Sequence, residues 1–193
     1  MSLMRRTWRM DRAKNAVYLT FDDGPIPDIT PWVLDQLKDA GVKATFFCVG
    51  DNVQKHPEIY QRLLLEGHAV GNHTMKHEKG TKVSLQRYLN SVEDTSRIME
   101  SKLFRPPYGR MTWKQSRALR REYKIVMWSW LTYDFDPKVS VSKIIQKARK
   151  EIRSGDIVVF HDNVKSFERL KVILPEVLND LRNKGLTSLP IAQ

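Results

Sequence analysis

The chain has 193 residues, 41% of them hydrophobic, and its 33 Lys and Arg against 22 Asp and Glu give a formal net charge of +11. This length and hydrophobic content suit one domain with a sizeable core, and no stretch approaches the ~18 apolar residues that a membrane span needs. Because Cys48 is the single cysteine, the chain cannot form an intramolecular disulfide or a cysteine zinc site. Any metal must therefore be held by histidines and carboxylates.

Residues 1–14 are predicted to form a basic N-terminal extension, and residues 15–193 the folded domain. No apolar signal core follows the arginines of the extension, so we expect neither an export signal nor a transmembrane segment. The start at Met1 leaves open that a leader was removed. Elsewhere the positive charge falls on amphipathic stretches such as residues 143–153. The sequence has no zinc-finger, RRM or KH pattern. We therefore interpret the positive charge as part of solvated helix faces and expect no nucleic-acid partner.

Strands and helices are predicted to alternate along the chain. Short apolar or β-branched runs predict strands at residues 17–21, 44–49, 69–71, 104–106, 125–130, 157–160 and 186–189. A 3.6-residue apolar period predicts helices at residues 30–41, 57–66, 84–103, 112–122, 142–153 and 167–184. Helices supply the crossovers that parallel strands need, so this alternation favours a parallel sheet with helices outside. A full eight-fold barrel takes ~250 residues, which leaves a reduced barrel or an open sheet.

Polar side chains gather where the predicted strands end. In both parallel architectures the functional site forms at the carboxyl ends of the strands. The polar residues found there are Asp22-Asp23 after the first strand, residues 72–77 after the third, residues 105–109 at the fourth, Asp134 after the fifth and His161-Asp162 after the sixth. The opposite ends of the strands have no comparable set, so the sequence predicts one site at the carboxyl ends.

His73 and His77 are four residues apart, a spacing that points two imidazoles at one centre on a helical turn or tight loop. Catalytic zinc sites use three protein ligands and keep one position open, so Asp22 or Asp23 is a candidate third ligand. Adjacent residues leaving a strand point in different directions, and the other aspartate would then face the reacting water. Two alternatives to a metal site remain. In one, the histidines are surface or capping residues, and in the other, Asp-Asp-Gly-Pro forms only a turn.

Other hydrolytic chemistries lack their residues in this chain. Thr74 follows His73, at the position where a thermolysin-like site has Glu, and no Gly-x-Ser-x-Gly elbow is present. Cys48 lies in an apolar run, where an inert buried thiol is expected. The sequence therefore favours a metal-assisted reaction over nucleophilic catalysis by serine or cysteine.

Two further pairs suggest an acid and an oriented base. His161 leaves an apolar strand, and a carboxylate at Asp134 beside it would suit a general acid. A guanidinium at Arg105 would orient Asp22 through paired hydrogen bonds. There is an alternative for each pair. His161 would be a core histidine with satisfied hydrogen bonds, and the prolines after Arg105 would only stiffen a turn.

In this order along the chain, these residues resemble the polysaccharide deacetylases with the NodB homology domain, known also as carbohydrate esterase family 4. The resemblance covers nearly the whole chain and rests on Thr20-Phe-Asp-Asp-Gly24, His73-Thr-Met-Lys-His77, Arg105-Pro-Pro-Tyr-Gly109 and Phe160-His161-Asp162. It implies a distorted, incomplete (β/α) barrel with about seven parallel strands. The roles that it implies are Asp22 as base, His161 as acid, Arg105 and Asp134 as the residues that orient them, and Asp23, His73 and His77 as ligands of a divalent metal, zinc or otherwise cobalt or another ion.

The fourth motif departs from the family pattern. Phe135 stands where Trp is frequent and Leu131 where Asp is frequent, and Val159 replaces a common Leu. These residues keep an apolar pocket for an acetyl methyl group. The resemblance assigns substrate binding to Phe135, Val159, Pro107 and Tyr108, with the backbone N–H of Tyr108 in the oxyanion hole.

The resemblance implies a metal-dependent hydrolase that removes N-linked acetyl groups from amino sugars of a glycan, such as peptidoglycan, a chitin-like oligomer or a surface polysaccharide. An O-acetyl xylan-type esterase would use the same machinery, and a glycan-binding module without turnover is a further alternative. The implied partner is the N-acetylated glycan itself, and we expect a monomer. Members of the family commonly act outside the cytoplasm, which implies an extracytoplasmic or cell-envelope location.

Overall fold

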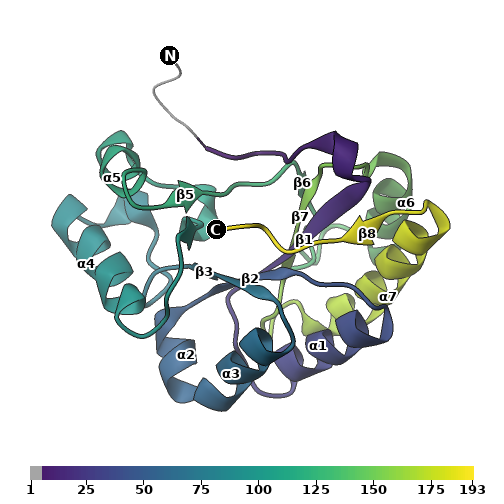
Figure 1. Cartoon of the computed structure of the whole chain (residues 1–193), viewed down its shortest axis with the longest axis horizontal. Coiled ribbons are helices and arrows are strands. Elements are labelled where there is room, and N and C mark those ends of the chain that lie inside the picture. The colour runs from purple at the N-terminus through teal and green to yellow at the C-terminus, as the bar shows by residue number, and fades with distance from the viewer. Residues whose placement is uncertain (1–5) are drawn as a thin grey trace.

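The computed structural model of the chain describes residues 6–193 (Figure 1). Its strands are β1 (Ala16–Asp22), β2 (Thr45–Cys48), β3 (Ala69–Asn72), β4 (Leu103–Phe104), β5 (Lys124–Ile125), β6 (Trp130–Leu131), β7 (Ile157–His161) and β8 (Thr187–Ser188). Its α-helices are α1 (Ile29–Asp39), α2 (Gly50–Lys55), α3 (Pro57–Leu65), α4 (Leu85–Ser96), α5 (Trp113–Leu119), α6 (Val141–Glu151) and α7 (Phe167–Asn183), and its 3-10 helices are η1 (Arg12–Lys14), η2 (Gly80–Lys82) and η3 (Pro107–Gly109). None of the described helices combines the length and the hydropathy that crossing a membrane requires.

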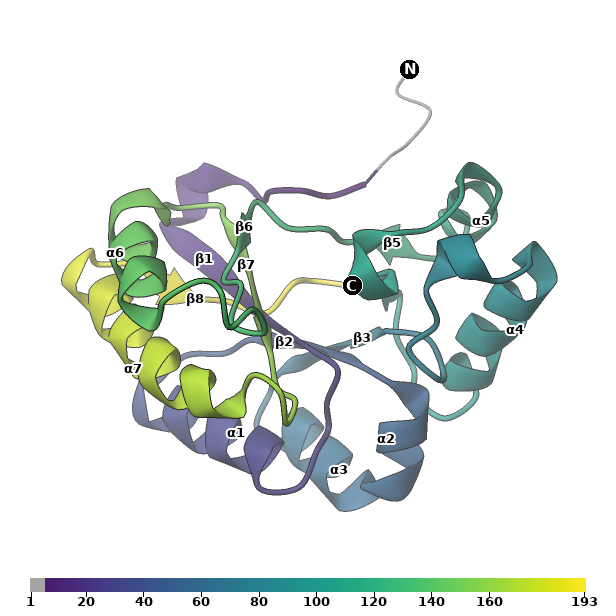
Figure 2. The ribbon, with the colours of Figure 1, turned by 180° about the vertical axis from the view of Figure 1, so that it is seen from behind.

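The strands form one curled sheet in the order β5-β4-β3-β2-β1-β7-β6, and β8 pairs with the start of β1. Every pairing between these strands is parallel. The helices lie outside the curl, with α4 and α5 on one side of the molecule and α6 and α7 on the other (Figures 1 and 2). In the described part of the chain, the two outermost strands β5 and β6 do not pair with each other. The expected fold, a distorted and incomplete (β/α) barrel, is confirmed.

Strand β1 is buried along its whole length: it has strands on both sides, and its side chains pack into hydrophobic clusters on the faces of the sheet. The ring of Phe21 stacks between the rings of Phe46 and Phe160, at centroid distances of 5.0 and 5.4 Å. Each aromatic pair of this kind contributes about 0.5–1.5 kcal/mol beyond the burial of its area. The packing fixes a register in which Asp22 lies opposite His161 on β7. A slip by one residue would turn the Asp22 side chain to the other face of the sheet.

One predicted strand, residues 125–130, is wrong as a single element. Lys124–Ile125 pairs with β4, whereas Trp130–Leu131 pairs with β7, so the chain crosses between the two outermost strands of the curl within this run. Both ends of the run are apolar, and periodicity does not reveal a change of pairing partner. The helix predicted to reach residue 103 ends at Ser96, and the Ser101 hydroxyl then donates to a carbonyl of β3.

The N-terminal segment packs against the barrel, although residues 1–5 of the predicted extension lie outside the described residues. The Thr7 amide donates to the Ile125 carbonyl at 2.8 Å. Arg9 forms an ion pair of 2.8 Å with Asp156, directly before β7. The segment therefore links the two sides of the gap between β5 and β6. The domain boundary predicted from the sequence stays a prediction.

Candidate active site

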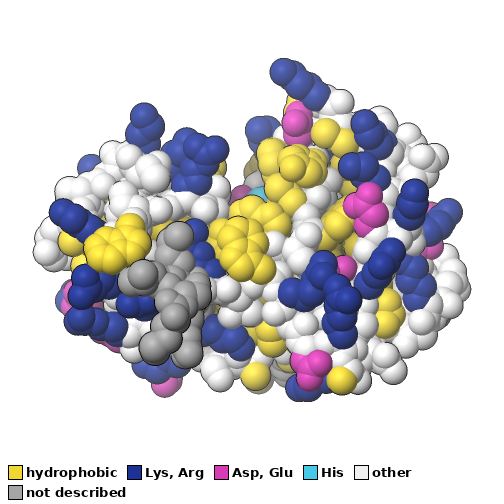
Figure 3. Space-filling view, turned by 90° about the horizontal axis from the view of Figure 1, so that it is seen from above, with side chains coloured by type: hydrophobic (Ala, Val, Ile, Leu, Met, Phe, Trp, Pro, Cys, Tyr) yellow, Lys and Arg dark blue, Asp and Glu magenta, His cyan; other side chains and the backbone are white. Residues whose placement is uncertain are grey.

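The loops after β1, β3, β4, β6 and β7 meet around a cavity of about 680 Å³ at the carboxyl ends of the strands. Figure 3 shows the surface hollowed between two lobes, with a histidine side chain visible in the hollow. Most residues predicted for the site line the cavity: Asp22, Asp23, His73, His77, Tyr108, Phe135, Val159 and His161. Arg105 and Asp134 are completely buried, and Pro107 is buried without lining the cavity.

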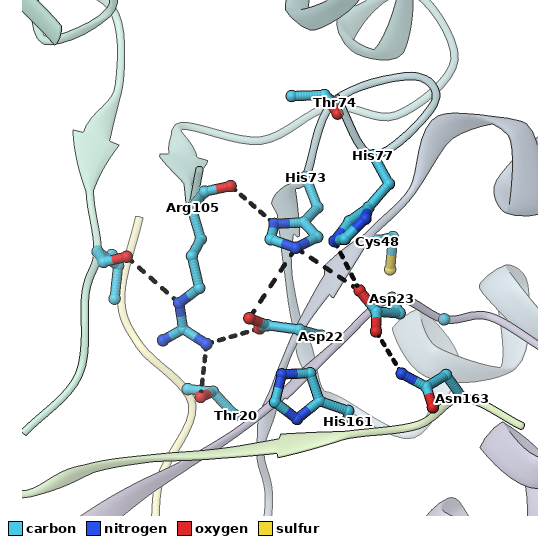
Figure 4. A network of polar contacts seen from close by, with 12 residues as sticks. Thr20, Asp22, Asp23, Cys48, His73, Thr74, His77, Arg105, His161 and Asn163 are labelled. Carbon is cyan, nitrogen blue, oxygen red and sulfur yellow. Dashed lines mark hydrogen bonds and ion pairs between the residues drawn. The ribbon is translucent and has the colours of Figure 1, made fainter. Parts of the chain in front are cut away.

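Asp23, His73 and His77 bring three potential ligand atoms to within 4.8 Å of one another. Asp23 Oδ1 lies 3.1 Å from His77 Nε2 and 3.8 Å from His73 Nε2 (Figure 4). This oxygen is buried and accepts no hydrogen bond from any residue between 6 and 193. A buried carboxylate oxygen without a partner is costly, and a divalent cation among these three atoms would remove that cost. The three side chains therefore fit a divalent metal.

Hydrogen bonds orient the groups of this triad. The ring of His73 uses Nδ1 to bond the Arg105 carbonyl at 2.7 Å, which leaves Nε2 facing Asp23. The side-chain amide of Asn163 donates to Asp23 Oδ2 at 2.5 Å, and that of Asn52 on α2 donates to the Asp23 carbonyl at 2.8 Å. The carboxylate therefore has one oxygen held by the protein and the other directed at the two imidazoles.

The charge states of the triad also suit a cation. Burial lowers the pKa of His73 to about 4, so this imidazole is neutral at pH 7 and its Nε2 can donate an electron pair. Burial alone would raise the pKa of Asp23, but His77, whose Nε2 lies 3.1 Å from Oδ1, and the other nearby histidines hold it below the usual range. Asp23 and His77 adopt φ values of 92° and 55°, a left-handed backbone that strains residues with a side chain and recurs at functional sites.

Asp22 lies beside the triad, with its Oδ2 4.0 Å from His73 Nε2. Its Oδ1 accepts a hydrogen bond of 2.6 Å from Nη1 of Arg105. The guanidinium lies 4.1 Å from the ring centroid of Phe47, and its Nη1 also donates to the Thr20 hydroxyl (Figure 4). One oxygen of Asp22 is thus fixed while the other faces the metal triad, an arrangement that suits a base acting on a water molecule there.

On the other side of Asp22, His161 ends β7 and is held by Asp134. The Asp134 carboxylate accepts hydrogen bonds of 2.7 Å from both the backbone amide and the Nδ1 of His161. Burial by itself lowers the pKa of His161, but the hydrogen bond and charge of Asp134 outweigh it and raise the pKa to about 9. The imidazole is therefore protonated at neutral pH in the metal-free protein, and its Nε2–H is available as an acid.

Apolar side chains line part of the same cavity. Val159, Leu131, Phe135 and Trp128 line it. The ring of Phe135 stands edge-on to the imidazole of His161 at a centroid distance of 5.0 Å. A small apolar group such as an acetyl methyl suits this part of the cavity.

The loop after β4 forms another wall. Tyr108 has a φ of 60°, and its ring lies 4.7 Å from that of His77. Gly109 follows with a φ of 65°, and a Cβ there would lie only 2.4 Å from the ring of Trp128. Only glycine fits this position without displacing the indole. Pro107 shapes the same turn, because its carbonyl accepts the Arg110 amide at 3.2 Å.

Sequence reasoning missed several contributors. It did not name Asn163, and it assigned no role to Thr20 or Asp162. Asp162 is completely buried and joins the first and last loops, because it accepts hydrogen bonds from the Gly24 amide at 3.1 Å and the Thr30 hydroxyl at 2.6 Å. Burial raises its pKa to about 8. The available signal was the polar run His161-Asp162-Asn163 at the end of a strand. The motif quoted from the sequence stops at Asp162, one residue before Asn163.

Comparisons with known proteins agree with this geometry. Residues 9–128 match the sequence profile of the polysaccharide deacetylase family. The chain is 32% identical to a peptidoglycan-N-acetylglucosamine deacetylase of Bacillus cereus, over 97% of this chain and 91% of that protein, and 36% identical to a chitooligosaccharide deacetylase of a Bradyrhizobium species, over 82% and 76%. A crystal structure of a peptidoglycan N-acetylglucosamine deacetylase superposes with a TM-score of 0.84, at 32% identity over 97% of this chain and 91% of the other. The chain belongs to the polysaccharide deacetylase family.

Proposed function

We propose that this protein is a metal-dependent hydrolase that removes N-linked acetyl groups from amino sugars of a glycan. Membership of the family and the similarity to named deacetylases support the reaction. The observation that carries the proposal is the buried Asp23 Oδ1, which lacks a hydrogen-bond donor among residues 6–193 and faces the Nε2 atoms of His73 and His77. Peptidoglycan, chitin-like oligomers and surface polysaccharides are the substrate classes under this proposal.

Asp23, His73 and His77 would hold the metal, which is zinc in our proposal, with cobalt or another divalent ion as alternatives. When bound, such a cation polarises the acetyl carbonyl and lowers the pKa of a water molecule beside it. The protein contributes one carboxylate and two imidazoles, which leaves room for water and substrate as catalytic metal sites require.

Asp22 is the proposed base. Its Oδ1 is held by Arg105, so its Oδ2 keeps the position needed to take a proton from the attacking water. The backbone N–H of Tyr108 is the proposed donor to the acetyl oxygen, where negative charge develops as the water adds. Pro107 acts through the turn that presents Tyr108.

His161 is the proposed acid. Its Nδ1 is bound to Asp134, so the proton on Nε2 is the one available to the departing amine of the sugar. Protonation of that nitrogen lets the C–N bond break, which releases acetate and the free amino sugar. Val159 and Phe135 would hold the acetyl methyl while this happens.

The cell envelope is the proposed place of action. The Bacillus cereus relative is named for peptidoglycan, which lies outside the cytoplasmic membrane. That the protein acts there as a monomer remains a prediction from the sequence.

Acetate release tests the proposal. The protein would be stripped with a chelator, reconstituted with zinc or cobalt, and assayed on N-acetylglucosamine oligomers and on peptidoglycan. We expect release that depends on added metal. His77→Ala should lose both metal and acetate release, whereas the matched control His56→Ala, outside the cavity, should keep both.

Two results would contradict the proposal. Acetate released from acetyl-xylan but from neither N-acetylated glycan would identify an O-acetyl esterase. Glycan binding without release from any acetylated substrate, despite stoichiometric metal, would identify a glycan-binding module. Metal content equal to wild type in His77→Ala would remove this residue from the ligand set.

A further inference from the structure

The N-terminal segment and Arg105 together bind the backbone of the crossing between β5 and β6. The Thr7 carbonyl accepts from the Met127 amide at 2.7 Å. The guanidinium of Arg105 donates to the carbonyls of Val126 and Met127, at 3.3 and 3.0 Å. Because the Val126 amide donates to the Phe104 carbonyl at 2.9 Å, each backbone N–H and C=O of these two crossing residues has a partner, as buried backbone requires. Figure 1 shows the segment running beside the crossing.

Met127 connects the N-terminal segment with the proposed base. Its amide is bonded to Thr7 and its carbonyl to Nη2 of Arg105, while Nη1 of the same guanidinium donates to Asp22 at 2.6 Å. A guanidinium is a planar, rigid fork of donors. When one of its acceptor carbonyls moves, the whole fork turns, and the N–H that faces Asp22 moves with it. The pairing of Thr7 with the crossing therefore influences where Arg105 holds the carboxylate.

The next residue of the segment contacts a wall of the cavity. The rings of Trp8 and Trp128 meet edge-on at a centroid distance of 6.4 Å, a geometry in which aromatic rings attract each other. Trp128 directly follows Met127 and lines the cavity. Its indole also packs closely on Gly109, where a Cβ would lie only 2.4 Å from the ring. Trp8 therefore supports the indole that borders the turn of Tyr108.

The other end of the segment is anchored away from the catalytic centre. The Met10 amide donates to the Gly155 carbonyl at 2.8 Å, and Arg9 is paired with Asp156. Both acceptors precede β7 at its amino end, whereas the site lies at the carboxyl ends of the strands. One short segment thus has a backbone contact that reaches Arg105 and another that does not.

We infer that Thr7 and Trp8 are positioning residues of the catalytic centre: Thr7 fixes the Arg105 fork through the crossing, and Trp8 fixes the cavity wall at Trp128. This inference rests on the proposed function, because it names residues on which the proposed base depends. Neither Thr7 nor Trp8 lines the cavity or belongs to the metal triad. Loosening their contacts should therefore lower kcat and kcat/KM together and leave the bound metal in place.

Two proline variants make the same change at the two ends of the segment. Thr7→Pro removes the amide that donates to the Ile125 carbonyl, and Met10→Pro removes the amide that donates to the Gly155 carbonyl. Each variant loses one backbone hydrogen bond, so urea denaturation should show similar destabilisation. Acetate release by the zinc-loaded full chain gives kcat and KM, and mass spectrometry gives the zinc content.

We expect the kcat of Thr7→Pro to fall about 5- to 30-fold at unchanged zinc content, because a misplacement of ~1 Å at a catalytic group costs up to ~100-fold in rate. Met10→Pro should stay within about twofold of the wild type, since its contact does not reach Arg105. Equal kcat values in the two proline variants would overturn the role of Thr7. A loss of zinc that accounts for the loss of kcat would overturn it as well.

A double-mutant cycle tests whether Arg105 is the link. Arg105→Lys keeps the charge but not the planar fork, so Thr7 no longer acts on Asp22 through a shared guanidinium. In that background Thr7→Pro should lower kcat by less than about twofold. Equal losses of kcat in both backgrounds would contradict the link.

Trp8→Ala keeps every backbone group and decides the inference if Thr7→Pro does not fold. Its kcat should fall about two- to fivefold as the support of Trp128 is lost. Trp113→Ala is the matched control, because Trp113 is exposed to a similar extent, 46% against 50% for Trp8, and lies outside the cavity. Equal kcat values in these two variants would contradict the role of Trp8.

An NMR signal of Arg105 tests the inference without activity. Its buried Nε–H, bonded to the Val126 carbonyl, should exchange slowly with solvent, and the signal is assigned by its absence in Arg105→Lys. In the metal-free protein this exchange should be roughly tenfold faster in Thr7→Pro and unchanged in Met10→Pro. Equal exchange rates in the two variants would overturn the inference. No acetate release by the wild type, despite bound zinc, would contradict the proposed hydrolase instead, and the exchange rates would still show whether Thr7 holds Arg105.

Discussion

The proposed base, Asp22, and the proposed acid, His161, are each held by a buried residue of opposite charge, on what we call the base side and the acid side of the centre. On the base side a buried cation, Arg105, holds the carboxylate of Asp22, and on the acid side a buried carboxylate, Asp134, holds the imidazole of His161. Both supporting residues are completely inaccessible to solvent. Asp22 and His161 also occupy matching positions on adjacent strands. The two sides differ in what else the supporting residue contacts.

Arg105 binds several segments at once. Besides Asp22, its guanidinium donates to the Thr20 hydroxyl at 2.8 Å, to the Val126 carbonyl at 3.3 Å and to the Met127 carbonyl at 3.0 Å. These groups belong to β1 and to the crossing between β5 and β6. Each carboxylate oxygen of Asp134, in contrast, accepts from His161. Arg105 therefore supports the fold as well as the proposed base, whereas the side chain of Asp134 supports mainly the proposed acid, and mutations should separate the two.

The largest effect is expected from Arg105→Met. The substitution leaves Asp22 buried without its cation and two backbone carbonyls without a donor, so the free energy of unfolding should fall by about 3–5 kcal/mol. Urea denaturation followed by circular dichroism measures this. Asp134→Asn keeps one amide oxygen as an acceptor but loses the charged hydrogen bond with His161, so the free energy of unfolding should fall by about 1.5–3 kcal/mol.

Arg105→Lys keeps the positive charge without the planar fork, and should lie between wild type and Arg105→Met. It also keeps the comparison measurable if Arg105→Met does not fold. Equal destabilisation by Arg105→Lys and Asp134→Asn would show that the additional contacts of Arg105 contribute little.

Asp22→Asn should lower kcat strongly, while its amide oxygen still accepts the hydrogen bond from Arg105. An amide does not accept the water proton, so kcat should fall roughly 100-fold or more, while Asp23, His73 and His77 still hold the metal. Acetate release and metal analysis by mass spectrometry give the two values. Asp39→Asn at the exposed end of α1 is the control and should match wild type. Turnover at the wild-type rate in Asp22→Asn would remove its role as base.

Asp134→Asn tests the acid side. The pKa of His161 is about 9, and without the Asp134 charge the effect of burial should dominate and bring it below ~6.5. Proton NMR titration of the metal-free protein measures this shift, and the rate at pH 8 should fall about 10- to 100-fold as the acid is lost. An unshifted His161 resonance would mean that another group sets its pKa.

The same pair makes stability depend on pH. Because the folded pKa of His161 is raised above the value of ~6.5 in the unfolded chain, its contribution to the free energy of unfolding is complete below pH ~6.5 and is lost as the pH rises through about 9. In Asp134→Asn this loss on the alkaline side should disappear. Urea denaturation of the metal-free protein at pH 6 and pH 9.5 compares the two.

The sequence predicts the barrel and the principal candidate residues because each signal is local. The two histidines of the triad are four residues apart, and Asp22 and Asp23 are adjacent, so strand ends and spacing suffice to identify them. Contacts between distant segments are different. Asn163 donates to Asp23 across a sequence separation of 140 residues, and no periodicity or spacing encodes that contact.

The crossing from β5 to β6 shows the same limit. Its sequence is apolar like a strand, yet the carbonyls of Val126 and Met127 within it accept from Arg105 rather than from a neighbouring strand. For these two carbonyls a buried guanidinium takes the place of a neighbouring strand, whereas the amides of the same residues donate to the Phe104 and Thr7 carbonyls. Strand prediction from apolar runs assumes that other strands satisfy the backbone, and it is wrong where a side chain does so.

Thr20→Val should give the smallest effect and tests whether the two sides are coupled. The Thr20 hydroxyl accepts from Arg105 and donates to the Val158 carbonyl on β7, three residues before His161. Valine keeps the shape but leaves a buried Arg105 N–H and a carbonyl without this partner, so the free energy of unfolding should fall by about 1–2 kcal/mol.

Thr45→Val is the matched control, because its hydroxyl is buried on β2 and accepts a distant backbone amide, that of Ile191. If the two sides are coupled, kcat should fall about two- to fivefold in Thr20→Val. Thr45→Val, at equal destabilisation, should show no such fall in kcat. Equal kcat values in the two variants would mean that Arg105 positions Asp22 without help from β7, and that the base and acid sides are independent.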